Sequence, residues 1–282
     1  MADTSGHCET LVRETDKDRF LATLFSPAAR RPALFALYAF NAEIARVRDV
    51  AREPMPGEIR LQWWREVVEG GRSEEARAHP VAAALIEATQ LYHLQVEALT
   101  EMIDAHAFDL YDDPMPALAH GEAYAAQTSA GLFSLAARIL DAQTDVRELA
   151  RHAGAAYAFA EWLRQFPRHA ARHQLFVPLD ILQRYGVNPE DIFAGKATPE
   201  LRAALAEMRL HIRGHLMAVH DRLAATSPAV LPAFLPVALV RPLLRRMERR
   251  GYDPFAPREV PQWWRQWTLW RAARHPRLMA AR

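Results

Sequence analysis

Residues 36–50 read ALYAFNAEIARVRDV, an aromatic, alanine-rich face followed by a cluster of charges. Apolar residues recur in this stretch at three- and four-residue spacing, which is typical of a helix with a buried face. The same spacing continues along most of the chain, whereas period-two alternation of Val and Ile is nearly absent. With 282 residues, half of them hydrophobic, and only 11 glycines, the sequence predicts an all-α fold with a sizeable core.

Prolines and capping residues divide this pattern into helices. The first opens at Ser26 and Pro27 and is expected to run to about residue 52, before Pro54, Pro56 and Gly57. Further helices are expected over about 58–70, after 79–80, over about 95–111, 121–140 and 146–166, after 188–189, and over about 199–225, 230–250 and 259–274. Residues 173–182, HQLFVPLDIL, are predicted to form a buried crossing loop that leads into a short helix. No linker rich in Gly, Ser or charge interrupts the chain, so we predict one domain over residues 1–282 with a flexible N-terminus over residues 1–16.

Charge and cysteine content narrow the classes of function. The 35 basic and 34 acidic residues nearly cancel, so no overall field draws the protein to nucleic acid. Cys8 is the only cysteine, which excludes an internal disulfide and favours a reducing, cytoplasmic location. The N-terminus does not read as a secretory signal, and the most apolar run, residues 231–240, carries two prolines and ends at Arg241. Peripheral contact with a membrane remains open.

Familiar catalytic motifs are absent from the sequence. There is no G-x-G-x-x-G, P-loop, G-x-S-x-G or H-E-x-x-H pattern, so dinucleotide, nucleotide, serine-hydrolase and zincin chemistry have no support. His211 and His215 stand four residues apart, a spacing that would supply two metal ligands if a third came from elsewhere. With Arg213 between them and His220 beyond, we interpret them as a polar helix face. The tryptophans at 63, 64, 263, 264, 267 and 270 would suit an aromatic recognition surface, but a core position is the expectation for any single one. Trp63 and Trp64 are adjacent and cannot share one helix face, so one is expected to pack inward and the other to reach a neighbouring helix or a partner.

Four short segments resemble landmarks of the squalene/phytoene synthase family. They are ALYAF at 36–40, QWWRE at 62–66, HPV at 79–81 and FVPLD at 176–180, in the family's order. The resemblance implies the isoprenoid-synthase fold, a helical bundle around a central cavity. Family enzymes join two prenyl diphosphates by means of two D-x-x-x-D motifs on facing helices. Acids at i and i+4 share a helix face and hold the Mg²⁺ ions that favour departure of diphosphate.

Both acidic motifs are depleted in this chain. By resemblance, the first falls at residues 45–49, where only Asp49 remains of three acids, and Ala45 and Arg46 stand at the positions of the other two. Glu43 is six residues from Asp49, about 240° around a helix, and does not substitute for the lost acid. The second motif falls at Gln165 and His169, where both acids are replaced.

The helix that carries the second motif is also interrupted. Pro167 lies between its two positions and removes a backbone donor. Arginine accompanies both motifs, because Arg46 and Arg48 lie within the first, Arg164 directly precedes the second, and Arg168 lies within it. Such sites should repel Mg²⁺, whereas they are suited to an anion.

One branch of the family is resembled more closely. AFNAEIARVRD and LQWWRE match the pattern of a divergent branch that includes the assembly factor of mitochondrial respiratory complex I. The resemblance implies a catalytically inactive fold that acts as an assembly or interaction factor for the NADH dehydrogenase, and we favour this hypothesis over an enzyme. The alternative is a prenyltransferase with an altered metal site, and a third is an isoprenoid- or lipid-binding protein.

These hypotheses fix the candidate residues and partners. We assign no catalytic residue; the motif remnants are Ala45, Asp49, Gln165 and His169, with Asp49 the weak candidate for a metal ligand. The candidates for substrate or anion binding are Arg46, Arg48, Asp109, Arg164 and Arg168. Asp109 and Asp180 are equally suited to cap helices. No cofactor is expected under the favoured hypothesis. Mg²⁺ is expected only if the protein is a prenyltransferase. The expected partners are NADH dehydrogenase subunits or assembly intermediates, an isoprenoid or lipid ligand, and no nucleic acid, in the cytoplasm or at the periphery of the inner membrane.

Overall fold

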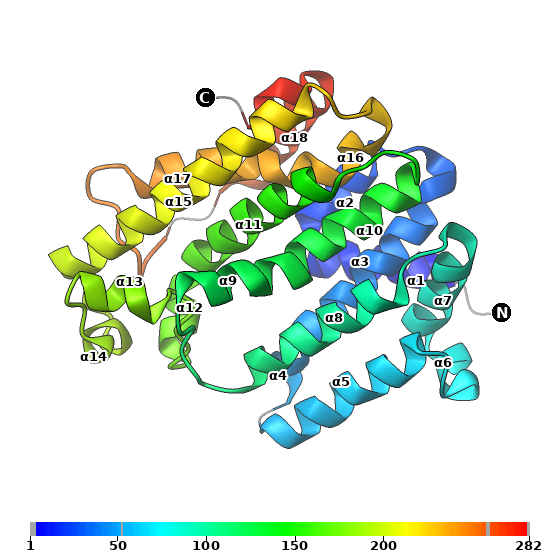
Figure 1. Ribbon diagram of the computed structural model, residues 1–282, viewed down its shortest axis with the longest axis horizontal. Helices are drawn as coiled ribbons and strands as arrows, with labels where there is room; N and C mark the ends of the chain where they lie inside the picture. Colours follow the sequence, from blue (N-terminus) through cyan, green and yellow to red (C-terminus); the bar gives the residue numbers. More distant parts are fainter. Residues whose placement is uncertain (1–3, 52, 258–259, 281–282) are drawn as a thin grey trace. The chain divides into compact units, whose positions relative to one another are not determined.

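The computed structural model describes residues 4–51, 53–257 and 260–280 (Figure 1). These residues contain α-helices and short 3-10 or π turns and no β-strand, which confirms the predicted all-α fold. Packing divides the chain into two compact units, unit 1 with residues 1–111, 131–150 and 226–236, and unit 2 with residues 112–130, 151–225 and 237–282. Each unit therefore joins three separate stretches of the chain. The prediction of one domain over residues 1–282 stays a prediction.

Unit 1 is built around helix α3 (Arg31–Ala45), which contains the stretch that predicted the fold. Every residue from Ala33 to Phe40 is buried, and a helix buried on all sides belongs at the centre of a bundle. Helix α3 contacts α1, α7, α8 and α10. The elements of unit 1 are α1 (Thr4–Thr15), α2 (Lys17–Thr23), η1 (Ala28–Arg30), α3, α4 (Val47–Val50), α5 (Pro54–Val68), α6 (Ser73–Ala78), α7 (Pro80–Tyr92), α8 (Val96–His106), η2 (Ala107–Leu110), α10 (Gly131–Leu140), η4 (Pro228–Val230) and α16 (Leu231–Phe234).

The expectation of a flexible N-terminus over residues 1–16 is not met where the structure describes them. Residues Thr4–Thr15 form α1, and helix α2 begins two residues later with Asp16 as its N-cap. Cys8 and Val12, four residues apart on one face of α1, are fully buried, and α1 packs on α3 and α7. Burial raises the pKa of the Cys8 thiol to about 11, so the thiol stays protonated at neutral pH.

Helix α5 carries the two adjacent tryptophans of unit 1, and the prediction that they face different surroundings is confirmed. Trp64 is 1% exposed, and its ring meets Phe40 of α3 edge-on at a centroid distance of 5.2 Å. Trp63 is partly exposed and donates its indole N–H to the Glu75 carboxylate of α6 at 3.0 Å. One ring therefore fills the core while its neighbour ties α5 to α6.

Unit 2 is arranged along the longest helix, α15 (Pro199–Leu223), drawn in yellow-green to yellow in Figure 1. Thr198 caps its first turn by accepting the backbone N–H of Leu201, and α15 contacts α13 and α17. The other elements are α9 (Leu118–Ala125), a π-helical segment η3 (Ala126–Ala130), α11 (Arg147–Arg164, its first turn counted with unit 1), α12 (Phe166–Ala171), α13 (Leu179–Arg184), α14 (Pro189–Phe193), η5 (Leu235–Leu239, which begins in unit 1), α17 (Val240–Met247), α18 (Gln262–Arg274) and η6 (Pro276–Met279). The start expected for the last helix, Glu259, lies outside the described residues.

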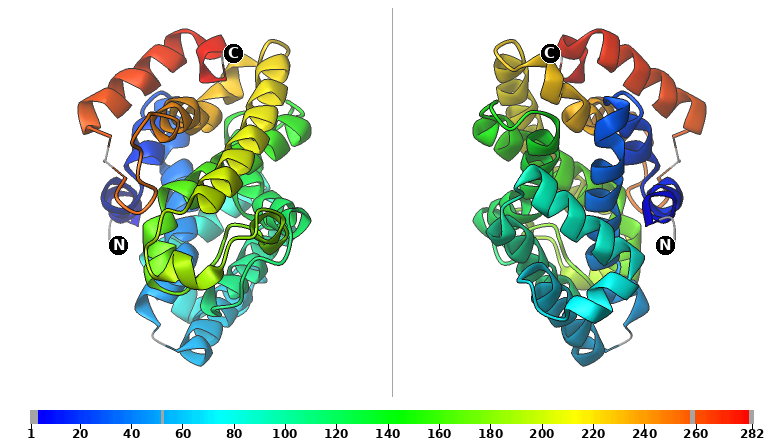
Figure 2. Two further views of the ribbon diagram at one scale, coloured as in Figure 1. Left: turned by 90° about the vertical axis from the view of Figure 1, so that its left-hand side faces the viewer. Right: turned by 90° about the vertical axis from the view of Figure 1, so that its right-hand side faces the viewer.

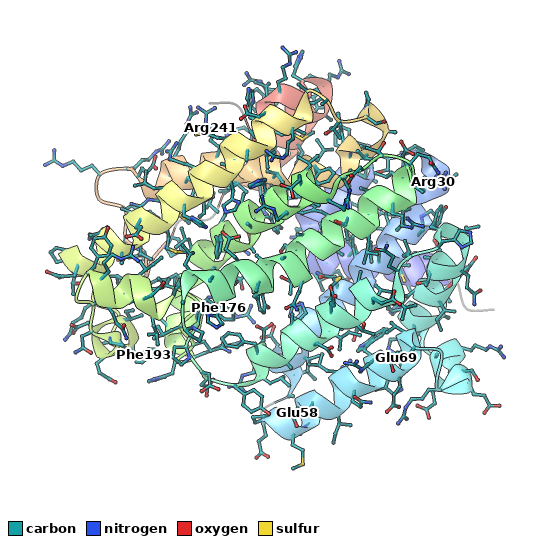
Figure 3. All side chains as sticks on the ribbon, viewed as in Figure 1. Arg30, Glu58, Glu69, Phe176, Phe193 and Arg241 are labelled. Carbon is teal, nitrogen blue, oxygen red and sulfur yellow. The ribbon has the colours of Figure 1, made fainter. Side chains whose placement is uncertain are left out.

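The predicted crossing loop of unit 2 is confirmed. Leu175, Phe176 and Val177 are buried, and the loop bonds to Met115 through two backbone hydrogen bonds of 2.8 and 2.9 Å. The short helix α13 follows. Phe176, labelled in Figure 3, packs its ring against Trp162 and His169. The loop therefore joins α11 and α12 to the start of α9.

One helical stretch among the described residues, Pro228–Met247, passes a test of length and composition for crossing a membrane. Its mean hydropathy is 1.4 and 56% of the tested window is buried in the protein, as in a core helix. The stretch is also divided into η4, α16, η5 and α17. Its three internal prolines at 232, 236 and 242 explain the division, because each lacks the N–H that continues a helix.

Candidate functional site

The remnant of the first acidic motif lies where α3 gives way to α4 in unit 1. The prediction of one continuous helix to about residue 52 is wrong here, because the backbone of Arg46 (φ −96°, ψ 2°) leaves the helical conformation. The carbonyl oxygen of Arg46 then accepts the N–H groups of Asp49 and Val50 and starts a new turn. Ala45 ends one helix and Asp49 belongs to the next, so these positions do not share one uninterrupted helix face.

Side chains around this remnant are mostly exposed. Ala45, Arg46 and Asp49 are exposed, and Arg48 is half-buried. Glu43 accepts a hydrogen bond of 2.8 Å from Arg60 of α5. The remaining acid of the motif, Asp49, therefore stands in an open, polar setting.

The remnant of the second motif lies at the junction of α11 and α12 in unit 2. Helix α11 ends at Arg164, Gln165 is the N-cap of α12, and Pro167 occupies the first turn of that helix. The predicted disturbance by Pro167 is thus confirmed. Arg164 binds the Glu161 carboxylate with contacts of 2.6 and 3.0 Å, and Gln165 reaches the same carboxylate at 3.4 Å. The Glu161 carboxylate therefore already pairs with Arg164, one of the arginines proposed for anion binding.

His169 of this remnant is half-buried and packs against Phe176, with ring centroids 4.5 Å apart. Burial, followed by the charges of Arg168, Arg172 and Arg164, lowers the pKa of His169 to about 4. At neutral pH the position of a metal-binding acid therefore carries an uncharged imidazole in a positive field.

Asp109 and Asp180, whose roles the sequence did not decide, each contact residues of their own unit. Asp109, in η2, lies 2.7 Å from Nδ1 of His106 in the preceding helix turn. Asp180 accepts the backbone N–H of Leu118, the first residue of α9, at 3.2 Å, and that of Ile181 at 2.8 Å. Asp180 thus caps α9, as one of the two interpretations predicted.

Unit 2 contains a cluster that the sequence revealed only in part. Glu122 of α9 places Oε1 2.5 Å from Nε2 of His211 and 2.8 Å from Nε2 of His215, both on α15. The two Nε2 atoms are 3.2 Å apart. On α11, His152 brings its Nδ1 to 3.0 Å from Nδ1 of His215. We call Glu122, His211, His215 and His152 the Glu–His cluster.

The Glu–His cluster replaces the interpretation of His211 and His215 as a plain polar helix face. The four-residue spacing identified the pair, but no pattern in the sequence pointed to a third residue 89 positions away. Burial alone would raise the pKa of Glu122, but hydrogen bonds and positive charge from the two histidines outweigh it and hold the pKa at about 2. Glu122 is therefore ionised at neutral pH and is available as a ligand for a cation.

A second feature of unit 2 is a groove between α17 and α18 of about 490 Å³. We define the tryptophan–arginine surface by six residues that line this groove, Arg241, Arg245, Arg249, Trp263, Trp267 and Arg271. Arg241 is labelled in Figure 3, and Figure 2 shows α18 in red. Trp263, Trp267 and Trp270 are 67%, 48% and 45% exposed, so the expectation of core positions is wrong for these three. Helix α18 buries Leu269 and Ala272 instead, and Trp264 is half-buried.

The fold and the motif positions define the class of this protein. A dehydrosqualene synthase solved in complex with a ligand has the same fold, with a TM-score of 0.83 over 97% of this chain and 96% of that protein at 15% identity. This is the helical isoprenoid-synthase fold. The sequence profile described as squalene/phytoene synthase matches residues 12–271, and the chain belongs to that family.

Relatives fall in both branches that the sequence suggested. A protein named NADH dehydrogenase (ubiquinone) complex I, assembly factor 6, from Rattus norvegicus is 30% identical over 262 residues, covering 90% of this chain and 77% of the relative. A phytoene synthase from Arthrospira platensis is 25% identical over 285 residues, covering 93% of this chain and 90% of the relative. The resemblance to the family and to its assembly-factor branch is confirmed.

Proposed function

We propose that this protein is a catalytically inactive member of its family that acts as an assembly or interaction factor for respiratory complex I. The observation that supports inactivity is the state of the second motif, where Gln165 and an uncharged His169 stand in place of two acids. Without carboxylates at these positions, Mg²⁺ has no ligands there with which to assist departure of diphosphate. Relatives named as complex I assembly factors support the assembly role.

The first prediction concerns catalysis. Purified protein incubated with farnesyl or geranylgeranyl diphosphate and Mg²⁺ should release no pyrophosphate, because Asp49 is the one motif acid that remains to bind the metal. A coupled pyrophosphate assay measures this, with an active phytoene synthase as positive control. Sustained release by this protein, abolished by Asp49→Asn, would establish the prenyltransferase alternative instead.

The second prediction concerns assembly. Deletion of the gene should lower NADH dehydrogenase activity and the amount of assembled complex I in membranes. Complementation with the wild type should restore both, and Asp49→Asn should restore them equally well, because the remnant acid has no catalytic task. Unchanged complex I in the deletion strain would rule out the assembly role. Normal production of an Asp49→Asn protein that fails to complement would argue against an inactive site.

We also propose peripheral contact with the anionic face of an inner membrane, through the tryptophan–arginine surface. Residues 237–282 contain 11 arginines and three acids, although the whole chain is nearly neutral. Burial and the charges of Arg245 and Arg213 lower the pKa of Arg241, as expected where positive groups are crowded. Tryptophans favour the headgroup region, and each arginine near an anionic surface contributes about 1 kcal/mol.

Co-sedimentation with lipid vesicles tests this contact. Binding to vesicles with anionic lipid should exceed binding to neutral vesicles and should weaken as salt increases. The double variant Trp263→Ala, Trp267→Ala and the double variant Arg245→Glu, Arg249→Glu should each lower affinity at least about tenfold. Leu210→Ala, a similarly exposed apolar residue on α15, is the matched control and should bind normally. Equal binding by all four proteins would exclude this surface.

A further inference from the structure

We propose that Glu122, His211 and His215 bind a divalent first-row transition-metal ion, such as Zn²⁺ or Fe²⁺. Two imidazole nitrogens and one carboxylate oxygen form a donor set that such ions accept. The three side chains come from two helices, α9 and α15, and their donor atoms lie together without rearrangement of the backbone. This inference goes beyond the proposed function and does not depend on it, since the acidic motifs of the family are elsewhere in the chain.

The distances in the cluster fit an ion of this kind. In a tetrahedral site with bonds of 2.0–2.1 Å, neighbouring donor atoms are about 3.3 Å apart. The Nε2 atoms of His211 and His215 are 3.2 Å apart already. The contacts of Glu122 are shorter, 2.5 and 2.8 Å, because hydrogen bonds join these atoms in the ion-free protein. A bound ion requires the carboxylate to withdraw by about 0.5–0.8 Å, which one side-chain rotation supplies.

The hydrogen bonding of the ion-free cluster leaves one contact that a cation would improve. Glu122 is ionised and only accepts, so His211 and His215 must both carry a proton on Nε2 to bond it. The two N–H groups then face each other at 3.2 Å and cannot bond to one another. An ion in place of both protons would turn three converging polar atoms into three ligands.

His152 is placed to orient one of these ligands. Its Nδ1 lies 3.0 Å from Nδ1 of His215, and its Nε2 lies 2.7 Å from the Arg151 guanidinium. When His215 binds metal through Nε2, its Nδ1 carries the remaining proton and donates to Nδ1 of His152. His152 then carries its own proton on Nε2, so the exposed Arg151 guanidinium turns away from that nitrogen. Histidine ligands commonly donate their second N–H to such a partner, which fixes the ring and strengthens the ligand. We therefore assign His152 as a positioning residue.

The exposure of the three ligand side chains indicates a metal site that is open to solvent, rather than a closed site with a purely structural role. The His215 side chain is 9% exposed, whereas those of His211 and Glu122 are 28% and 29% exposed. Phe159 of α11 forms an apolar wall, with its ring 5.3 Å from that of His211. Three protein donors leave at least one coordination position, which water or a small ligand would fill from the solvent side.

Metal titration of the purified full-length protein tests the proposal. After removal of metal with a chelator, Co²⁺ should bind at one equivalent and give the visible absorption of a low-symmetry site. Zn²⁺ should displace it, while Mg²⁺ at the same concentration should not. Anaerobic titration with Fe²⁺ then distinguishes iron from zinc as the preferred ion. Absence of stoichiometric Co²⁺ or Zn²⁺ binding would overturn the proposal.

Variants separate this site from adventitious binding. Glu122→Gln and His211→Asn should each lower Co²⁺ affinity at least about 100-fold, and His152→Ala about 10- to 100-fold. His120→Ala, which removes an exposed imidazole two residues before Glu122 on α9, should leave affinity unchanged. Circular dichroism of each metal-free variant shows that it is folded. Equal affinity in the wild type and in folded Glu122→Gln and His211→Asn proteins would refute the assignment.

Discussion

Replacement of Gly154 by alanine should destabilise the protein by about 3 kcal/mol or more, with a fall in melting temperature of about 6–12 °C. Gly154 lies on α11, where a Cβ atom would come within 2.4 Å of the backbone nitrogen and 2.5 Å of the Cα atom of Ala130. Contacts this short with backbone atoms force α11 and η3 apart. The better helix propensity of alanine, about 1 kcal/mol, offsets only part of this cost.

Two further variants test whether backbone contacts cause the loss of stability expected in Gly154→Ala. Gly214 lies inside α15, where a Cβ would meet nothing within 4 Å, so Gly214→Ala should stabilise the protein by about 0.5–1 kcal/mol. Adding Ala130→Gly to Gly154→Ala should recover only a small part of the loss, because the backbone contacts remain. Urea denaturation measures all three free energies of unfolding. A neutral Gly154→Ala, or full recovery by Ala130→Gly, would contradict a backbone contact as the cause.

Acidification should destabilise the protein through His169. The folded-state pKa is about 4 and the ordinary value is 6.5, so between these values the unfolded chain binds more protons at this residue. The stabilising effect of the neutral, buried imidazole is complete above about pH 6.5 and is lost as pH falls toward 4. Between pH 7.5 and 5 this one group should lower the free energy of unfolding by about 2 kcal/mol.

The variant His169→Phe isolates this contribution. It keeps an aromatic ring against Phe176 and removes the group that titrates. Free energies of unfolding, measured with urea at pH 7.5 and 5, should fall about 2 kcal/mol less in the variant than in the wild type. His173→Ala, an exposed histidine after α12, is the control and should retain the wild-type dependence. Identical pH dependence in the wild type and His169→Phe would show that His169 does not resist protonation.

Much of the fold was predictable because its signals are local. Helical spacing, proline positions and the capping residues Thr198 and Asn188 placed the main helices, and the apolar run up to Phe40 marked a buried helix. The break at Arg46 and the helix α1 were not predicted. Helix α1 depends on contacts with other parts of unit 1, because its residues Cys8 and Val12 are buried beneath α3 and α7.

The candidate site divides in the same way. The sequence identified the replaced acids at Gln165 and His169, but the low pKa of His169 follows from its burial and from three arginines gathered around it. The expectation that tryptophans lie in the core was wrong for three residues of α18. Which side of a helix is buried depends on the elements that pack against it. The sequence alone shows that the acidic residues are replaced. The charge state and the exposure of a side chain depend on the residues that surround it in the folded protein.

The sequence by itself determined the helical class, the family and the loss of the two acidic motifs, because spacing and residue identity are properties of neighbours along the chain. Only the tertiary structure decided that Glu122 of α9 meets His211 and His215 of α15, since folding brings together side chains that are 89 and 93 residues apart in the chain. Chain separation of that length leaves no periodic signal. The cluster exists because side chains of two helices converge in space.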